Sequence, residues 1–400
     1  MAILVTAILI IYGLLLVAST TSFEIQIQSE LLEAEVFSYD FWQGSIKLWE
    51  KGSPLLSLLV IVFSGVWPLV KQLLTVYATS LPPQTELSWL RVLGVTGKTA
   101  FLDVTIVAVV VTTISFELQI EGFEMFDGFI AAVPSNGACF TLLILILSRL
   151  FTSLLIHVFP PEVPIATHAA LDIDNNSSEE EAMDPTEKTE EGRLPCSRTP
   201  TTSFGCFLKS FGVVCAILAP FLVTIGASLP FASRTFQLRN YFGDPDDFIN
   251  LGSGYEDYTL WSMFSGRFSV SDENAGARWF IDCVAIFFVI FIGLPAAFAP
   301  ACSLIYHPYA STSAKNKIRN VLELLNEWAS LDVATIGTII MTTQMDDFAE
   351  SISNTVDFDP ATWTGPQMVI ELKAQEGLWL CFCGSWMGLF SSLMVLKWWY

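Results

Sequence analysis

A chain of 400 residues with 52% apolar and only 15% charged residues, and a mean hydropathy of +0.55, is too apolar for a soluble globular protein. The net charge of −21 excludes nucleic acid as a partner, and it is unevenly distributed: nine acids lie between Asp172 and Glu191. Composition therefore predicts a polytopic membrane protein that carries an acidic, solvated linker.

Runs of apolar residues long enough to cross the membrane recur along the whole chain, since about 20 residues span a bilayer of about 30 Å. We predict an all-α fold of about eight transmembrane helices. The first run lacks the basic residues of a signal peptide, so we expect a retained helix, although cleavage near Ser19 stays open. The predicted spans are 2–20, 54–78, 101–116, 137–158, 207–230, 279–306, 331–345 and 377–396.

The acidic linker divides these spans into two tandem four-helix modules. The first module is predicted at 1–160, the linker, expected to be disordered, at 161–205, and the second module at 206–400. Pro68 and Pro300 lie in the second and sixth spans, where a proline removes one helical hydrogen bond, so both are candidate helix kinks.

Charge asymmetry predicts the orientation. The loops at 21–53, 117–133, 231–278 and 346–376 contain 24 acids and seven bases, whereas the short loops after the second and sixth spans are basic. By the positive-inside rule the basic loops are cytosolic, and both termini and the linker are then cytosolic too. We expect an integral protein of the plasma membrane or an endomembrane.

A Leu-Asp-Val sequence opens the third and the seventh predicted spans, with its acid at Asp103 and Asp332. Two interpretations stay open: the carboxylates cap the helix N-terminus, or they act directly in transport or gating. From Asp332 a polar stripe continues along one side of the helix and should face the bundle interior or a wet cavity. The candidate groove or gating residues are Asp103, Asp332, Thr335, Thr342 and Asp346.

No residue pattern in the chain indicates catalysis, a cofactor or a metal. The sequence Gly94–Thr99 ends like a phosphate-binding loop but lacks its first glycine and a preceding strand. The eight cysteines form no CxxC pair and the three histidines have no ligand spacing. We therefore expect a protein that is not an enzyme.

A set of short motifs recurs in order through the first half: Phe37-Ser38, Gly44–Trp49, Leu58–Lys71, Gly97-Lys98 and Leu102-Asp103-Val104. The second half is a weaker copy, in which Tyr258-Thr259, Pro300 and Trp328–Val333 replace the corresponding residues. With these motifs the first half resembles the paraquat-inducible protein A family, which includes the bacterial lipophilic envelope-spanning tunnel A proteins.

The resemblance implies tandem membrane modules in a family that is linked to lipid movement between membranes. Bacterial members carry zinc ribbons before each module, and this chain lacks them. The expected function is phospholipid transport between or across membranes, with membrane lipids and a lipid-tunnel or other membrane protein as partners. The alternative is a scaffold or stress-response subunit that transports nothing and docks a partner through its exterior loops.

Overall fold

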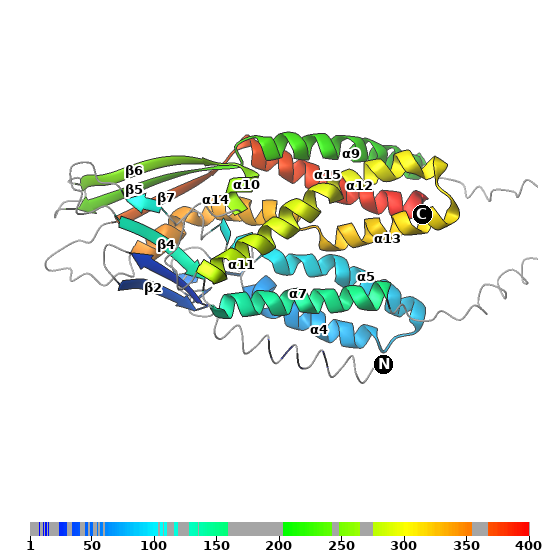
Figure 1. Ribbon diagram of the computed structural model, residues 1–400, viewed down its shortest axis with the longest axis horizontal. Helices are drawn as coiled ribbons and strands as arrows, with labels where there is room; N and C mark the ends of the chain where they lie inside the picture. Colours follow the sequence, from blue (N-terminus) through cyan, green and yellow to red (C-terminus); the bar gives the residue numbers. More distant parts are fainter. Residues whose placement is uncertain are drawn as a thin grey trace, which may run out of the picture.

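In the computed structural model the helices are gathered at one end of an elongated molecule, and two antiparallel β-sheets lie at the other end (Figure 1). Helix α14 (Leu331–Ser353) runs from the helical end into the level of the sheets. Single positions between 8 and 58 and between 105 and 109 are described. The continuous stretches that the structure describes are 24–29, 34–40, 61–102, 116–118, 128–134, 136–158, 203–241, 248–264, 275–353 and 367–399.

The first sheet is built from the first 134 residues and has the strand order β2-β1-β4-β3. Strand β1 alternates apolar and polar residues, as a strand with two different faces requires. It pairs Ile25 with Tyr39 on β2 and with Pro134 on β4, so it lies inside the sheet. The strands are β1 (Glu24–Ser29), β2 (Ala34–Asp40), β3 (Phe116–Leu118) and β4 (Gly128–Pro134).

The second sheet has the strand order β6-β5-β7, and all its pairings are antiparallel. Across the β5–β6 pair, the buried Arg234 guanidinium forms an ion pair of 2.9 Å with Glu256. The strands are β5 (Ala232–Tyr241), β6 (Phe248–Tyr258) and β7 (Gln367–Ala374).

The two sheets are not part of the predicted fold, which is all-α with four exterior loops. Each of the four stretches predicted as an exterior loop contributes at least part of one strand. Their pairing joins residues far apart in the chain, such as Ser29 with Ile130 and Ala232 with Ala374. Partners at such separations leave no local sequence pattern that predicts the pairing.

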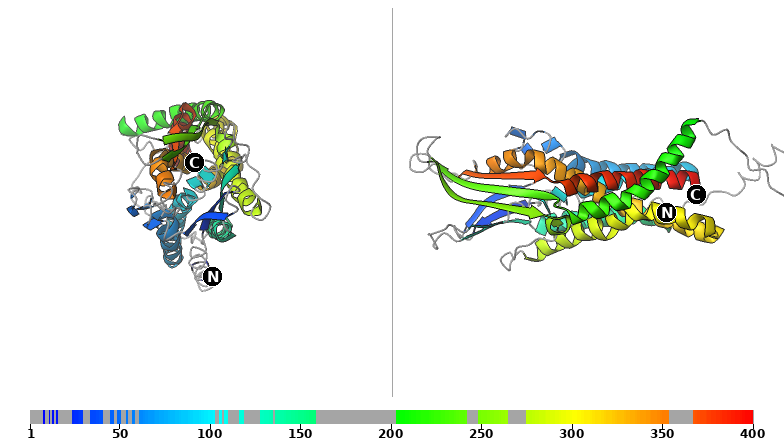
Figure 2. Two further views of the ribbon diagram at one scale, coloured as in Figure 1. Left: turned by 90° about the vertical axis from the view of Figure 1, so that its left-hand side faces the viewer. Right: turned by 90° about the horizontal axis from the view of Figure 1, so that it is seen from above.

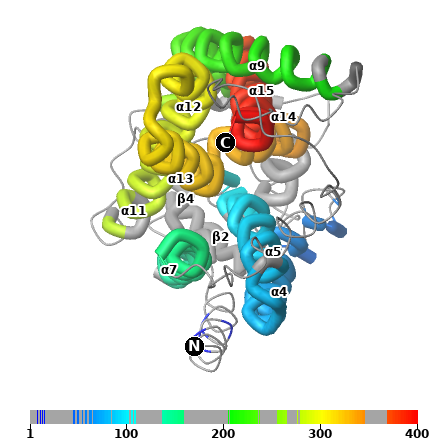
Figure 3. The backbone as a smooth tube through the Cα atoms, turned by 90° about the vertical axis from the view of Figure 1, so that its right-hand side faces the viewer, coloured from blue at the N-terminus to red at the C-terminus, as the bar shows by residue number. Residues whose placement is uncertain are grey.

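The helices form a bundle in which elements of both halves lie side by side (Figures 2 and 3). Viewed from the helical end, α13 lies between α12 and the first-half helices α5 and α7 (Figure 3). In the first half the helices are η2 (Ile61–Val66), α4 (Trp67–Ala78), α5 (Pro83–Thr96), η3 (Gly97–Phe101) and α7 (Asn136–His157). In the second half, besides α14, they are α9 (Ser203–Ser228), α10 (Leu260–Phe264), α11 (Ala275–Ile286), η5 (Phe287–Ile292), α12 (Gly293–Tyr306), η6 (His307–Tyr309), α13 (Thr312–Trp328) and α15 (Glu376–Trp399).

Five stretches in the described part of the chain are long and apolar enough to cross a membrane, which confirms the predicted helical membrane class. The predicted seventh span lies in α14, which is not among the five. The predicted spans at 2–20 and 101–116 and the linker at 161–205 lie wholly or largely outside the described residues. The five stretches are Ile61–Ala78, Gly137–His157, Phe207–Ser228, Trp279–Tyr309 and Glu376–Trp399.

Two of these stretches contain a π-helix that leads into a proline-bearing α-helix. In the first half η2 precedes α4, whose second residue is Pro68. In the second half η5 precedes α12, whose third residue is Pro295, whereas Pro300 lies deeper inside the same helix. Pro295 therefore lies closer to its π-helix than Pro300 does. Wide π turns and prolines both favour bends in helices, so a bend is expected near each of these two junctions.

One hydrophobic core joins the two halves. Phe101 and Leu102 of the first half and Phe288 and Leu331 of the second half belong to the same buried cluster. The rings of Phe101 and Phe288 lie 4.6 Å apart between centroids. Because this contact lies between the halves, the described helices pack as one bundle.

Candidate functional site

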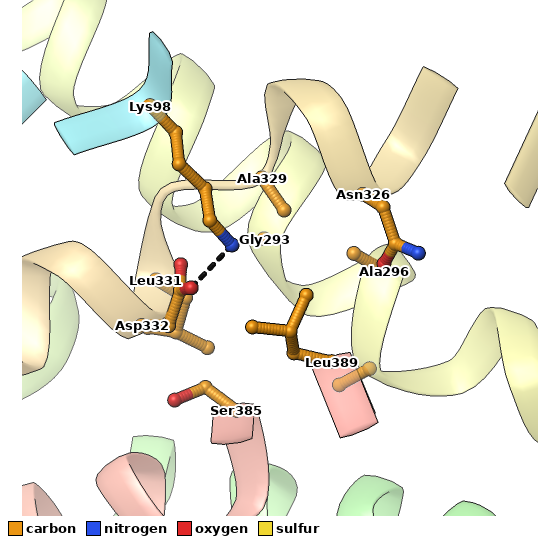
Figure 4. Close-up of a pocket in the computed structure, with 10 residues that line it drawn as sticks. Lys98, Gly293, Ala296, Asn326, Ala329, Leu331, Asp332, Ser385 and Leu389 are labelled. Carbon is orange, nitrogen blue, oxygen red and sulfur yellow. Dashed lines mark hydrogen bonds and ion pairs between the residues drawn. The ribbon is translucent and has the colours of Figure 1, made fainter. Parts of the chain in front are cut away.

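A small pocket lies inside the bundle where η3 meets the start of α14 (Figure 4). Its cavity is about 20 Å³, enough for about one water molecule. Most of its wall is apolar, and four polar side chains reach it. The lining residues are Lys98, Gly293, Ala296, Ala297, Asn326, Ala329, Leu331, Asp332, Ser385 and Leu389.

The central polar feature of the pocket is an ion pair between the two halves. Lys98 on η3 and Asp332 in the first turn of α14 point toward each other, and the Lys98 ammonium donates to an Asp332 carboxylate oxygen (Figure 4). The two residues are 6% and 5% exposed. A buried pair of this kind is costly to break, because either partner alone would be an uncompensated charge.

A second cluster of buried charge lies on the first-half side of α13. One oxygen of Glu327 accepts a hydrogen bond of 3.3 Å from the Ser153 hydroxyl and lies 3.4 Å from His157 Nε2. The other oxygen of this carboxylate makes no hydrogen bond among the described residues. The neighbouring Trp328 donates its indole N–H to Ser153 Oγ at 3.3 Å. Glu327 therefore reaches from the second half into the first half.

Arg149 of α7 lies between two aromatic rings at this level. Its guanidinium carbon is 4.7 Å from the Phe101 ring centroid and 5.0 Å from that of Trp328, so it makes a cation–π contact with each half. The residue is 1% exposed. Glu327 and Asp332 attract its charge, whereas Lys71 of α4, which is 5% exposed, repels it.

The glycines beside these charges leave room for them. A side-chain carbon at Gly97 would lie 2.5 Å from the Lys71 ammonium nitrogen, and one at Gly94 would lie 3.1 Å from a Glu327 oxygen. Both glycines belong to the α5–η3 stretch that also carries Lys98. The backbone approaches the buried charges closely there because no Cβ intervenes.

The residues predicted as a groove or gate are only partly brought together. Asp332 lines the pocket, and the fully buried Thr335 donates its hydroxyl to the Asp332 backbone carbonyl at 2.9 Å. Thr342 is half-buried and donates to Ile339 within its own helix. Asp346 lies on α14, but its side chain, like the whole of Asp103, falls outside the described residues. Part of the pocket wall is formed by α12 and α15 of the second half.

Sequence reasoning missed the buried roles of Lys71, Lys98, Arg149 and Glu327. From the sequence, Lys71 near the end of the second predicted span and Lys98 in the loop after it count as cytosolic basic residues. Both are buried, so they are no evidence for orientation. A detectable signal existed for Arg149, because a lone arginine in the 22-residue apolar α7 must find a place inside the bundle. The partners themselves come from the other half and leave no local signal.

Apolar helices long enough to span a bilayer, with ionisable side chains buried among them, define a polytopic integral membrane protein. Residues 1–154 match the model of the family described as Paraquat-inducible protein A, which confirms the predicted resemblance for this part of the chain. Comparison with curated proteins and with solved structures found no match.

Proposed function

We propose that this membrane protein moves or hands over phospholipid between or across membranes. The observation that supports the proposal is the pocket around Lys98 and Asp332, where one ion pair lies among small apolar side chains of α12 and α15. A lipid needs polar groups for its head and an apolar path for its tails, and the lining has both types of side chain. The closed cavity holds about one water molecule, so the proposal requires the bundle to open at this level before a lipid enters. The described residues contain no nucleotide-binding loop, so a gradient or a partner protein would supply direction.

Two tandem modules are part of the proposal. The strand order β2-β1-β4 corresponds to β6-β5-β7, and in both sheets the last-named strand directly precedes an apolar helix, α7 or α15. The π-helix before a proline and the helices α5 and α13, which follow it, also occur at matching places. Lys98 and Glu327 each lie five residues before the aspartate of a Leu-Asp-Val sequence. These correspondences support duplication and about eight spans, three more than the five candidates in the described residues.

The orientation proposed from charge places the sheets outside the cytosol and α13 inside it. Lys71 and Lys98 are buried and do not count toward this charge pattern. The helical end still carries exposed basic residues, Lys317 on α13 and Arg91 on α5. The end of α15 and the start of α9, which follows the linker, both lie at the helical end (Figure 1), so the proposal places the C-terminus and the linker in the cytosol. The charge pattern along the chain places the N-terminus there too.

We expect a cysteine at Tyr255 on the sheet and one at Tyr309 on the helical end to react from opposite sides of the membrane. Tyr255 is 66% exposed and Tyr309 is 87% exposed, so both positions are open to a reagent. A membrane-impermeant maleimide applied to intact cells should label Tyr255→Cys, and it should label Tyr309→Cys only after permeabilisation. The unsubstituted protein measures the background from native cysteines. The reverse labelling pattern would invert the proposed orientation.

Replacing Asp103 and Asp332 together with alanine should abolish lipid transfer between vesicles that contain the purified protein. A second variant, Lys98→Met with Asp332→Leu, removes both charges of the ion pair without leaving an unpaired one, and it should also lose transfer while it stays folded. Asp257→Ala, an exposed acid on β6, is the matched control and should transfer normally.

Unchanged transfer in both charge variants would remove the role proposed for the pocket. The scaffold alternative makes a different prediction, because it requires a partner to co-purify without bound lipid. Mass spectrometry of the lipid retained by the purified protein separates the two functions directly.

A further inference from the structure

The buried charges at the level of Arg149 do not balance. Three cations, Lys71, Lys98 and Arg149, face two carboxylates, Glu327 and Asp332, and all five residues are at most 6% exposed. Lys98 and Asp332 neutralise each other as an ion pair. Lys71 and Arg149 therefore share Glu327 alone, and one positive charge remains without a counter-charge among these buried residues. An uncompensated charge is energetically costly inside a membrane bundle.

The hydrogen-bonding capacity of Arg149 is also unused. None of its three guanidinium nitrogens makes a hydrogen bond within the part of the chain that the structure describes. Glu327, whose charge has the largest electrostatic effect on Arg149 among the acids, instead uses one oxygen for Ser153 and His157. Guanidinium N–H groups are strong donors, and they are rarely left unpaired when buried.

The aromatic residues around Arg149 stabilise its positive charge, but they leave its N–H donors without hydrogen bonds. The rings of Phe101 and Trp328 contact the guanidinium through their π-systems, and Phe288 stacks on Trp328 with 5.5 Å between ring centroids. A cation–π contact stabilises the positive charge but leaves the in-plane N–H groups able to pair with oxygen atoms. The fork of N–H donors matches two oxygens of one phosphate group.

We propose that Arg149, with Lys71 beside it, is a binding site for one phosphate oxyanion. A single negative phosphodiester would neutralise the excess charge and satisfy the unpaired donors at the same time. The source that fits a membrane bundle is the headgroup of an anionic phospholipid, and this source, though not the anion site, rests on the function proposed above. Free phosphate offers the same oxyanion, so the experiment must separate the two.

The test measures the thermal unfolding of the full-length protein in detergent with three probes. Dioctanoyl phosphatidylglycerol carries the phosphate and tails, dioctanoylglycerol carries only the tails, and inorganic phosphate carries only the anion. We expect the phosphatidylglycerol to raise Tm of the wild-type protein saturably and the dioctanoylglycerol to leave it unchanged. A saturable shift with inorganic phosphate that the lipid does not exceed would keep the anion site and assign it to free phosphate.

Variants at Arg149 identify the residue. Arg149→Gln should raise the Kd for dioctanoyl phosphatidylglycerol, taken from the concentration dependence of the Tm shift, by roughly 10- to 100-fold. The substitution removes a positive charge and the pair of N–H donors that can bind two phosphate oxygens. Arg149→Lys keeps the charge but not the fork and should be intermediate. The matched control is Arg91→Gln, an arginine whose side chain is 42% exposed and which pairs with Glu323, and it should bind as the wild type does.

Equal affinity of Arg149→Gln and wild type, or an equal response to dioctanoylglycerol, would overturn the proposal. If Arg149→Gln fails to fold, Lys71→Gln decides, and it should weaken phosphatidylglycerol binding by a smaller factor. This result is independent of the vesicle assay: a wild-type protein that binds phosphatidylglycerol but transfers no lipid contradicts only the proposed function.

Discussion

Asp332→Ala alone should lower the free energy of unfolding by about 3–5 kcal/mol, because Lys98 would stay buried without its counter-charge. Lys98→Met should be costly for the same reason, since it leaves the Asp332 carboxylate unpaired. The double variant Lys98→Met with Asp332→Leu should recover most of the loss, since buried ion pairs are often replaced by apolar side chains at little cost. Unfolding in a denaturing detergent, analysed as a double-mutant cycle, gives the coupling energy.

Arg91 and Glu323 provide the control for this cycle. The Arg91 nitrogen lies 3.5 Å from the Glu323 oxygen, and the arginine side chain is 42% exposed. We therefore expect a coupling energy of about 1 kcal/mol or less for this pair. Equal coupling in the two cycles would mean that the Lys98–Asp332 pair is solvated and would contradict the buried arrangement.

Gly377→Ala should destabilise the bundle by about 3 kcal/mol or more. A Cβ at this position would lie 2.6 Å, 2.7 Å and 2.9 Å from the backbone carbonyl oxygens of Pro230, Gly226 and Leu229. Backbone atoms cannot rotate away, so α15 would have to move off α9 along part of their contact. The loss of helix packing can be measured by the same detergent unfolding.

Gly276 is the matched control, because a Cβ there would meet no other atom within 4 Å. It lies near the start of α11, where alanine is a better helix former than glycine, so Gly276→Ala should be neutral or stabilising by up to about 1 kcal/mol. A similar loss in both variants would show that close approach of α9 and α15 is not the cause.

The sequence predicts the five candidate spans of the described residues because each depends on a local property, a run of about 20 apolar residues. The strands show the limit of such reasoning. Glu24–Ser29 alternates in polarity as a strand should, but a single short alternation between apolar runs does not reveal its second partner, β4, which begins 104 residues after Glu24, at Gly128. Pairing over that distance depends on the tertiary fold.

The candidate site was predictable to a similar extent. The position of Asp332 at the start of a helix followed from the Leu-Asp-Val sequence, and α14 begins at Leu331. Its partner Lys98 lies 234 residues away in the chain, and nothing near either residue indicates the other. Polar threonines facing the interior were expected from helical periodicity, and Thr335 is fully buried.

The distribution of the buried charges makes each half incomplete without the other. Every buried lysine or arginine that faces Glu327 or Asp332 in the described bundle, namely Lys71, Lys98 and Arg149, comes from the first half of the chain. A C-terminal half made alone would have to bury two carboxylates, and an N-terminal half made alone would have to bury three strong cations. The buried charges thus make the packing of the two halves selective, because a second copy of either half would place like charges against one another.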